Sequence, residues 1–151
     1  YNKDDVAAKQ LSFEAMAKGL LQDTWTGLSE ADRKEFLAHL ETLIRRMSFT
    51  KGRDMFQYLD AVLYAPVTMH GEAAHCKSTV VVHRELKKTE IPIEWVLVKE
   101  GGAWKVADTV TLGESTTEGI RQDQVLPLLK EGGIPALMDA LRKKAAELKK
   151  A

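Results

Sequence analysis

Side chains that could ligate a metal ion gather between residues 70 and 83. Three of the four histidines, His70, His75 and His83, lie in this stretch, and the single cysteine, Cys76, follows His75. Their spacing matches no zinc-binding pattern. Neighbouring residues on a strand point to opposite faces, so His75 and Cys76 would not converge on one ion. We therefore expect no metal site and no cofactor, and nothing beside Cys76 in the sequence would activate it as a nucleophile.

Asp108 is the residue best placed for acid–base chemistry. It shares the parity of Trp104 and Leu112, so strand alternation predicts that it lies on an apolar face. A carboxylate there must be paired or protonated, because an isolated buried charge is costly. One interpretation is a general acid or base in an apolar pocket, as in ketosteroid isomerase. The other is a carboxylate that holds a strand end through the backbone or the Ser115 hydroxyl. We favour the second, because no second catalytic group accompanies Asp108.

Composition excludes several classes of protein. The 151 residues are about one domain, and 44% hydrophobic with 29% charged residues is typical of a globular chain. Lys plus Arg and Asp plus Glu both number 22, and this zero balance disfavours nucleic-acid binding. One cysteine excludes an internal disulfide, and no apolar run approaches the roughly 18 residues of a membrane span. The phosphate-loop, G-x-S-x-G and H-E-x-x-H signatures are absent, so the sequence carries no standard catalytic motif.

Helices are expected at both ends of the chain. Apolar residues at three- and four-residue spacing predict helices over residues 4–22 and from Ser29, a capping residue, onward. A shorter helix is expected over residues 51–59. Near the C-terminus, a helix capped by Thr116 or Thr117 should end at Gly132-Gly133, and a last helix should carry Pro135 in its first turn.

Between the helices, apolar residues alternate with the period of two that is typical of strands. Strands are predicted over residues 78–84, 91–99 and 104–112, with a hairpin turn at Glu100-Gly101-Gly102. This antiparallel meander has one apolar and one polar face. The fold class is therefore α+β, with an antiparallel sheet between N-terminal and C-terminal helices.

Two apolar rows could form either an ordinary core or the wall of a ligand pocket. The pattern alone favours a core. The helical row is Phe36, Leu40, Leu43, Ile44 and Met47, and the sheet row is Ile91, Ile93, Trp95, Leu97, Val106, Val110 and Leu112.

Several motifs, in a fixed order along the chain, together resemble a known family. They are Phe13-Glu14-Ala15-Met16-Ala17 with Trp25 and Leu28-Ser29, then Ile93-Glu94-Trp95-Val96-Leu97-Val98, Trp104-Lys105-Val106-Ala107-Asp108, Gly113-Glu114-Ser115 and Gly132-Gly133-Ile134. On these residues the chain resembles the MlaC, or toluene-tolerance, family of lipid-binding auxiliary components of ABC transporters. Trp104, Asp108, Gly113 and Ser115 correspond to the structural motif of that family.

The resemblance implies a fold and a function. The fold would be the cone-shaped α+β fold of nuclear transport factor and ketosteroid isomerase, with a curved antiparallel sheet and extra helices. The function would be that of a monomeric periplasmic carrier without enzymatic activity. It would hold a phospholipid by its acyl chains and pass it between an inner-membrane ABC transporter with an MCE-type subunit and an outer-membrane lipoprotein complex. Only this resemblance turns the two apolar rows into predicted lipid-binding residues. The alternatives are an enzyme on the same fold that uses Asp108 as an acid or base in an apolar pocket, and a ligand-free interaction module.

The chain departs from the family pattern at the expected mouth of the pocket. Ala107 replaces a tyrosine and Glu114 an apolar residue, and residues 116–119 are more polar than usual. These departures bear on which lipid is carried rather than on the fold. Family members carry a further helical stretch before this point, so we expect residues 1–151 to be a single lipid-binding domain trimmed at its N-terminus.

Overall fold

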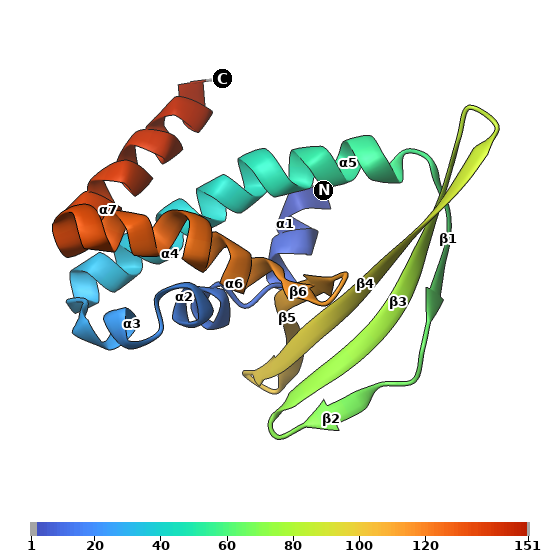
Figure 1. Ribbon diagram of the computed structural model, residues 1–151, viewed down its shortest axis with the longest axis horizontal. Helices are drawn as coiled ribbons and strands as arrows, with labels where there is room; N and C mark the ends of the chain where they lie inside the picture. The colour runs from blue at the N-terminus through green and yellow to red at the C-terminus, as the bar shows by residue number, and fades with distance from the viewer. Residues whose placement is uncertain (1–2, 151) are drawn as a thin grey trace. The chain divides into compact units, whose positions relative to one another are not determined.

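The computed structural model describes residues 3–150, which form two compact units. The sheet unit comprises residues 3–12 and 49–116, and the helical unit comprises residues 13–48 and 117–150. Each unit is therefore built from two stretches that are distant in the sequence, as the colours in Figure 1 show. The predicted α+β class is confirmed, because helices precede and follow an uninterrupted run of strands.

The sheet unit contains one antiparallel six-stranded sheet. Its order is β1-β3-β4-β5-β6, and β2 also pairs with β3. The long strands β3 and β4 curve along their length (Figure 1), as the right-handed twist of strands requires. The strands are β1 (Leu59–Tyr64), β2 (Thr68–His70), β3 (Ala73–Arg84), β4 (Lys87–Glu100), β5 (Ala103–Thr111) and β6 (Glu114–Ser115). The three predicted strands correspond to β3, β4 and β5.

Three hairpins of this sheet have two-residue turns in which both residues have positive φ. Gly101-Gly102, the predicted turn, has φ of 58° and 83°, and Leu112-Gly113 has 53° and 79°. Glu85-Leu86, between β3 and β4, has 51° and 65°. Positive φ at both positions is the type I′ geometry, which favours glycine or asparagine. The third turn contains neither, and left-handed geometry costs roughly 1–2 kcal/mol per non-glycine residue.

The single helix predicted over residues 4–22 is wrong. The chain forms α1 (Lys3–Lys9) and α2 (Phe13–Leu21), separated by three residues that pair with β5. The Ser12 amide donates to the Val106 carbonyl at 2.9 Å, and the Val106 amide donates to the Gln10 carbonyl at 2.7 Å. These backbone groups are satisfied by the sheet, so the helix cannot continue through them. The break also marks the passage from the sheet unit to the helical unit.

The helix predicted over residues 51–59 is α5 (Phe49–Phe56). It continues from α4 (Glu30–Leu43) through a π-helical turn, η1 (Ile44–Ser48), and belongs to the sheet unit. The guanidinium of Arg53 on α5 donates to the carboxylate of Asp4 on α1 at 2.6 Å, which ties the two short helices together.

The remaining helices form the helical unit and confirm most of the predicted signals. The Ser29 hydroxyl accepts the Asp32 amide at 3.1 Å and so caps α4. Before the strands, α3 (Asp23–Gly27) precedes α4. After the strands, α6 (Thr116–Ile120) is followed by a π-helical turn, η2 (Arg121–Val125), which leads into α7 (Leu126–Lys150). A cap at Thr116 would place the first helical residue at Thr117, but helix α6 already begins at Thr116. Gly132 and Gly133 have non-helical φ and ψ, so α7 is two helices, and Pro135 opens the second as predicted.

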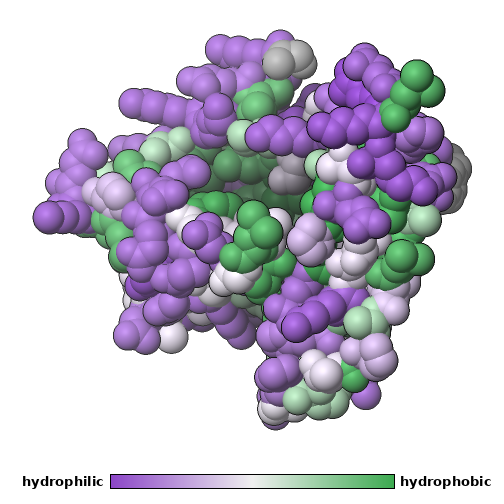
Figure 2. Space-filling view, turned by 45° about the vertical axis from the view of Figure 1, so that its right-hand side comes forward, coloured by the Kyte–Doolittle hydropathy of each residue, from purple (hydrophilic) through white to green (hydrophobic). Residues whose placement is uncertain are grey.

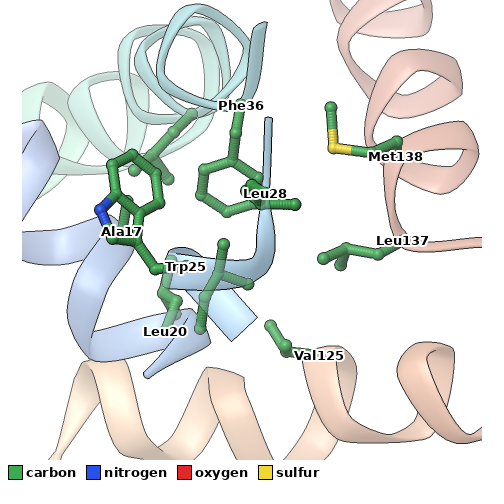
Figure 3. Close-up of a cluster of buried hydrophobic side chains, with 10 residues drawn as sticks. Ala17, Leu20, Trp25, Leu28, Phe36, Val125, Leu137 and Met138 are labelled. Atoms are coloured by element: carbon green, nitrogen blue, oxygen red, sulfur yellow. The ribbon is translucent and has the colours of Figure 1, made fainter. Parts of the chain in front are cut away.

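The helical unit has its own hydrophobic core (Figure 3). Trp25 and Phe36 meet edge to face with ring centroids 6.5 Å apart. The fully packed members are Ala17, Leu20, Leu21, Trp25, Leu28, Phe36, Leu40, Val125, Leu137 and Met138. On the surface, the Arg142 guanidinium on α7 donates to both oxygens of Glu35 on α4, at 2.6 and 2.9 Å. The hydrogen bonds from Arg142 and then His39 lower the pKa of Glu35 to about 2.

Candidate functional site

The two faces of the sheet differ in what they carry. In an antiparallel pair, residues directly opposite each other share a face. Trp95 lies opposite Cys76 and Thr109, whereas Glu94 lies opposite Lys77 and Val110. We call these the Trp95 face and the Glu94 face.

A β-bulge in β5 divides the predicted sheet row between the two faces. Leu97 pairs with Val106, but the preceding Val96 pairs with Asp108, so Ala107 is the extra residue of the bulge. One inserted residue reverses the facing of everything beyond it. Ile91, Ile93, Trp95, Leu97 and Val106 therefore lie on the Trp95 face, and Val110 lies on the Glu94 face. Leu112 lies in the β5–β6 turn and is 85% exposed.

The same bulge corrects the expected setting of Asp108. This residue lies on the Glu94 face and not with Val106. Its Oδ1 accepts the Thr109 amide at 2.8 Å, and its Oδ2 accepts the hydroxyl of Ser115 on β6. Oδ2 thus holds β6 against the end of β5, while Oδ1 is fixed by the backbone of β5 itself. The hydrogen bonds that the structural interpretation predicted, to the backbone and to the Ser115 hydroxyl, are both present.

The other motif residues also serve the sheet. Gly113 supplies the second positive φ, 79°, of the β5–β6 turn that brings Ser115 to Asp108. Trp104 lies at the start of β5 opposite Lys99 and is 43% exposed. Asp108, Gly113 and Ser115 therefore shape the β5–β6 hairpin, and Trp104 belongs to the β4–β5 hairpin.

A cleft of about 620 Å³ opens within the sheet unit. By register, half of its twelve lining residues belong to the Glu94 face. Ser78 and Ile93 belong to the Trp95 face, and Tyr64-Ala65 and the turn at Leu112-Gly113 border the cleft. The lining residues on the Glu94 face are Leu63, Lys77, Thr79, Pro92, Glu94 and Val110. Its volume falls within the range of about 300–1,000 Å³ that is usual for ligand pockets.

Two charged groups lie opposite each other in this mainly apolar cleft. Glu94 Oε1 lies 3.5 Å from Nδ1 of His75 on the neighbouring strand. Lys77, paired with Glu94 in register, forms no ion pair within the described part of the chain. The cleft thus offers apolar walls and an available ammonium group. The sequence did not identify Lys77 and Glu94, because residues 17 positions apart meet only through strand register.

The Trp95 face is held by a buried serine that sequence reasoning also missed. Ser78 is 5% exposed, and its hydroxyl donates to the Ile93 carbonyl and accepts from Trp95 Nε1, both at 2.8 Å. The polar edge of the indole is therefore satisfied inside the sheet unit. No sequence-local signal marks this pair, because it depends on the register of β3 and β4.

The predicted helical row lies in the helical unit. Phe36 and Leu40 are 2% and 8% exposed in its core, and Ile44 packs against that core. Leu43 and Met47 are half-buried. Packing explains the burial of Phe36 and Leu40, and their contact with a lipid stays a prediction.

Apolar side chains also reach the surface of the sheet unit along its β1 and β2 edge. Leu63, Tyr64, Val67 and Met69 are each more than half exposed. In the space-filling view, hydrophobic side chains emerge at several places on a largely hydrophilic exterior (Figure 2). Among residues 3–150, no three His, Cys, Asp or Glu side chains are grouped so that they could hold a metal ion. Within the same range, no helix is both long and apolar enough to cross a membrane.

Comparison with known proteins identifies the family of this chain. The model of the MlaC protein family matches residues 3–143. A solved structure, the phospholipid-binding protein from Ralstonia solanacearum in complex with a phospholipid, superposes with a TM-score of 0.76 at 17% identity, covering 94% of this chain and 77% of that one. A second, a variant of the protein Rd1NTF2, gives a TM-score of only 0.30 at 16% identity, over 72% and 97% of the two chains. No curated protein matches. The family match spans nearly the whole chain, and the chain belongs to the MlaC family.

Proposed function

We propose that this chain is a non-enzymatic carrier that binds the acyl chains of a phospholipid and that residues 1–151 act as one lipid-binding domain. The observation that carries the proposal is the mainly apolar cleft of about 620 Å³ in the sheet unit. Membership of the MlaC family and the phospholipid held by the Ralstonia protein of the same fold support it.

The energetics of lipid transfer require such a cleft. Burial of hydrocarbon is worth about 0.8 kcal/mol per methylene, so a chain of roughly fifteen methylenes gains about 12 kcal/mol in a bilayer. A carrier must replace most of this, or the lipid stays in the membrane. Of the predicted lipid-binding residues, Ile93, Val110 and Leu112 line the cleft. Leu63 and Leu112 are 59% and 85% exposed, so an acyl chain laid over them would cover apolar surface that water now contacts.

We further propose that Lys77 sets the position of the head group. Its ammonium lies in the wall of the cleft, opposite Glu94, without an ion pair among the described residues. An ammonium is a compact point charge suited to a phosphate oxygen. The head group would then stay near water while the acyl chain follows the apolar residues.

Membership of the MlaC family supports a cellular role. We propose that the chain works in the periplasm and passes phospholipid between an inner-membrane ABC transporter with an MCE-type subunit and an outer-membrane lipoprotein complex. Zero net charge suits this role, because the protein would leave either membrane without a strong bulk electrostatic hold.

The test is to measure bound lipid directly. Native mass spectrometry and solvent extraction of the purified chain should find phospholipid near one molecule per chain. After delipidation, uptake of a monomeric lysophospholipid should fall about tenfold or more in Leu112→Asp, because a charge would replace an apolar contact. Met69→Asp is the matched control, since Met69 is 59% exposed in β2 and does not line the cleft. Equal uptake by both variants, or no uptake by the wild type, would refute the proposal.

A further inference from the structure

The hairpin tip between β3 and β4 combines strain with exposure. Glu85 and Leu86 both have positive φ, and the pair Arg84 and Lys87 closes the turn. The two other turns of this geometry each contain glycine, including the one that begins with Leu112, whereas in this turn neither residue is glycine. Leu86 is 97% exposed, so no packing within the chain compensates for the strain. Backbone strain that no packing contact offsets is an indication of a functional role.

Cations flank this apolar tip in the sequence. Residues 84–88, the tip segment, contain Arg84, Lys87 and Lys88 and the single anion Glu85. The Arg84 guanidinium lies 4.9 Å from the centroid of the Tyr58 ring, and Lys88 Nζ lies 3.6 Å from Asp60 Oδ2. Lys87 makes no ion pair within residues 3–150. The tip segment around the fully exposed Leu86 thus carries three cations and one anion, a net charge of +2.

Further apolar side chains lie at the same end of the sheet unit. The His83 amide donates to the Tyr58 carbonyl at 2.9 Å, and Leu59 pairs with Val82, so the end of α5 and the start of β1 adjoin the hairpin (Figure 1). Met55, Phe56 and Leu59 in these segments are 40%, 43% and 44% exposed. The tip segment therefore stands beside a wider, partly apolar end of the unit.

We propose that the tip segment docks the sheet unit on an anionic lipid bilayer. Leu86 enters the interfacial region, and Arg84, Lys87 and Lys88 meet the phosphates of the head groups. A segment with one exposed apolar residue and several cations complements an anionic bilayer, which has negative head groups at its surface and apolar acyl chains some 5–10 Å below them.

Docking of this kind is weak and reversible. Each cation near an anionic surface strengthens binding about fivefold, and burial of one leucine strengthens it about tenfold to a hundredfold. Salt screens the electrostatic part. The contact is separate from the cleft, because neither Leu86 nor the three cations line it. It therefore goes beyond lipid binding and describes how the chain approaches a membrane.

The test is vesicle flotation of the full chain with phosphatidylcholine vesicles, with and without phosphatidylglycerol. The wild type should float with the anionic vesicles at low salt and be released at high salt. Leu86→Ser should lower binding about tenfold or more, and Lys87→Glu should do the same. The matched controls are Val67→Ser, at a side chain 57% exposed outside the tip, and Lys99→Glu, at an exposed lysine of β4. Both should bind like the wild type.

A fourth variant separates docking from folding. Leu86→Gly relieves the left-handed strain, so it should raise the melting temperature while it lowers vesicle binding as Leu86→Ser does. Uptake of monomeric lysophospholipid should be unchanged in all tip variants, which keeps this test independent of the proposed cargo site. Wild-type protein that floats with neither vesicle, or Leu86→Ser that binds like the wild type, would overturn the proposal. Loss of exchange with membrane complexes in a tip variant, without vesicle binding by the wild type, would assign the tip to a protein partner and also overturn it.

Discussion

Phe36 gives the sharpest test of whether the helical row is core or pocket wall. Its side chain is 2% exposed and meets Trp25 edge to face at 6.5 Å. Removal of a buried phenylalanine leaves a cavity and costs about 3–5 kcal/mol, of which the aromatic pair accounts for about 0.5–1.5 kcal/mol. We therefore expect Phe36→Ala to lower the free energy of unfolding by about 4 kcal/mol. In a chain of this size, this is roughly 8–16 °C in melting temperature.

The measurement must be made on delipidated protein. Truncation of a core side chain lowers the stability of the lipid-free protein. Truncation of a side chain that only lines a lipid pocket leaves that stability nearly unchanged and weakens lipid binding. Urea unfolding followed by far-UV circular dichroism gives the free energy, and Leu112→Ala, at an 85% exposed site, should change it by less than about 0.5 kcal/mol. A loss below about 1 kcal/mol for Phe36→Ala, together with a large loss of lipid affinity, would refute the assignment of Phe36 to the core.

Three further predictions follow from the ion pair, the strained turn and the Asp108 carboxylate. The pKa of Glu35 is lowered to about 2 from 4.5, so its bond to Arg142 stabilises the helical unit above about pH 4.5 and is lost as the pH falls towards 2. Arg142→Met should therefore shift acid unfolding, followed by circular dichroism, to higher pH. Leu86→Gly should raise the free energy of unfolding in urea by about 1 kcal/mol, and a decrease would show that the turn is unstrained. Asp108→Ala leaves the Ser115 hydroxyl and an amide without their acceptor, and calorimetry should show a loss of about 1–3 kcal/mol.

Local signals in the sequence predicted local structure well. Ser29 as a helix cap, the break at Gly132-Gly133 and the turn at Gly101-Gly102 all depend on residues within a few positions of each other. Hydrogen bonds over such short spans follow from residue type alone. The antiparallel sheet was likewise predictable from alternation.

Features that depend on distant residues could not be predicted. The bulge at Ala107 adds one residue to β5, and alternation carries no mark of it, so Asp108 and Val110 were assigned to the wrong face. The break between α1 and α2 exists because Ser12 finds a partner in Val106, far along the chain. The charged pair of the cleft, Lys77 and Glu94, meets only through register.

The division of the chain into interleaved stretches has a consequence for the order in which the protein folds. The helical unit needs residues 13–48 and 117–150, and the Arg142–Glu35 hydrogen bonds join positions 107 residues apart. During synthesis, α4 emerges well before α7, so the side of α4 that packs against α7 stays uncovered while residues 49–116 of the sheet unit are made. Closure of so long a loop is slow compared with local hairpin formation. We therefore expect the sheet hairpins to form first and the helical core to close last, which gives chaperones a long interval in which to hold the nascent chain.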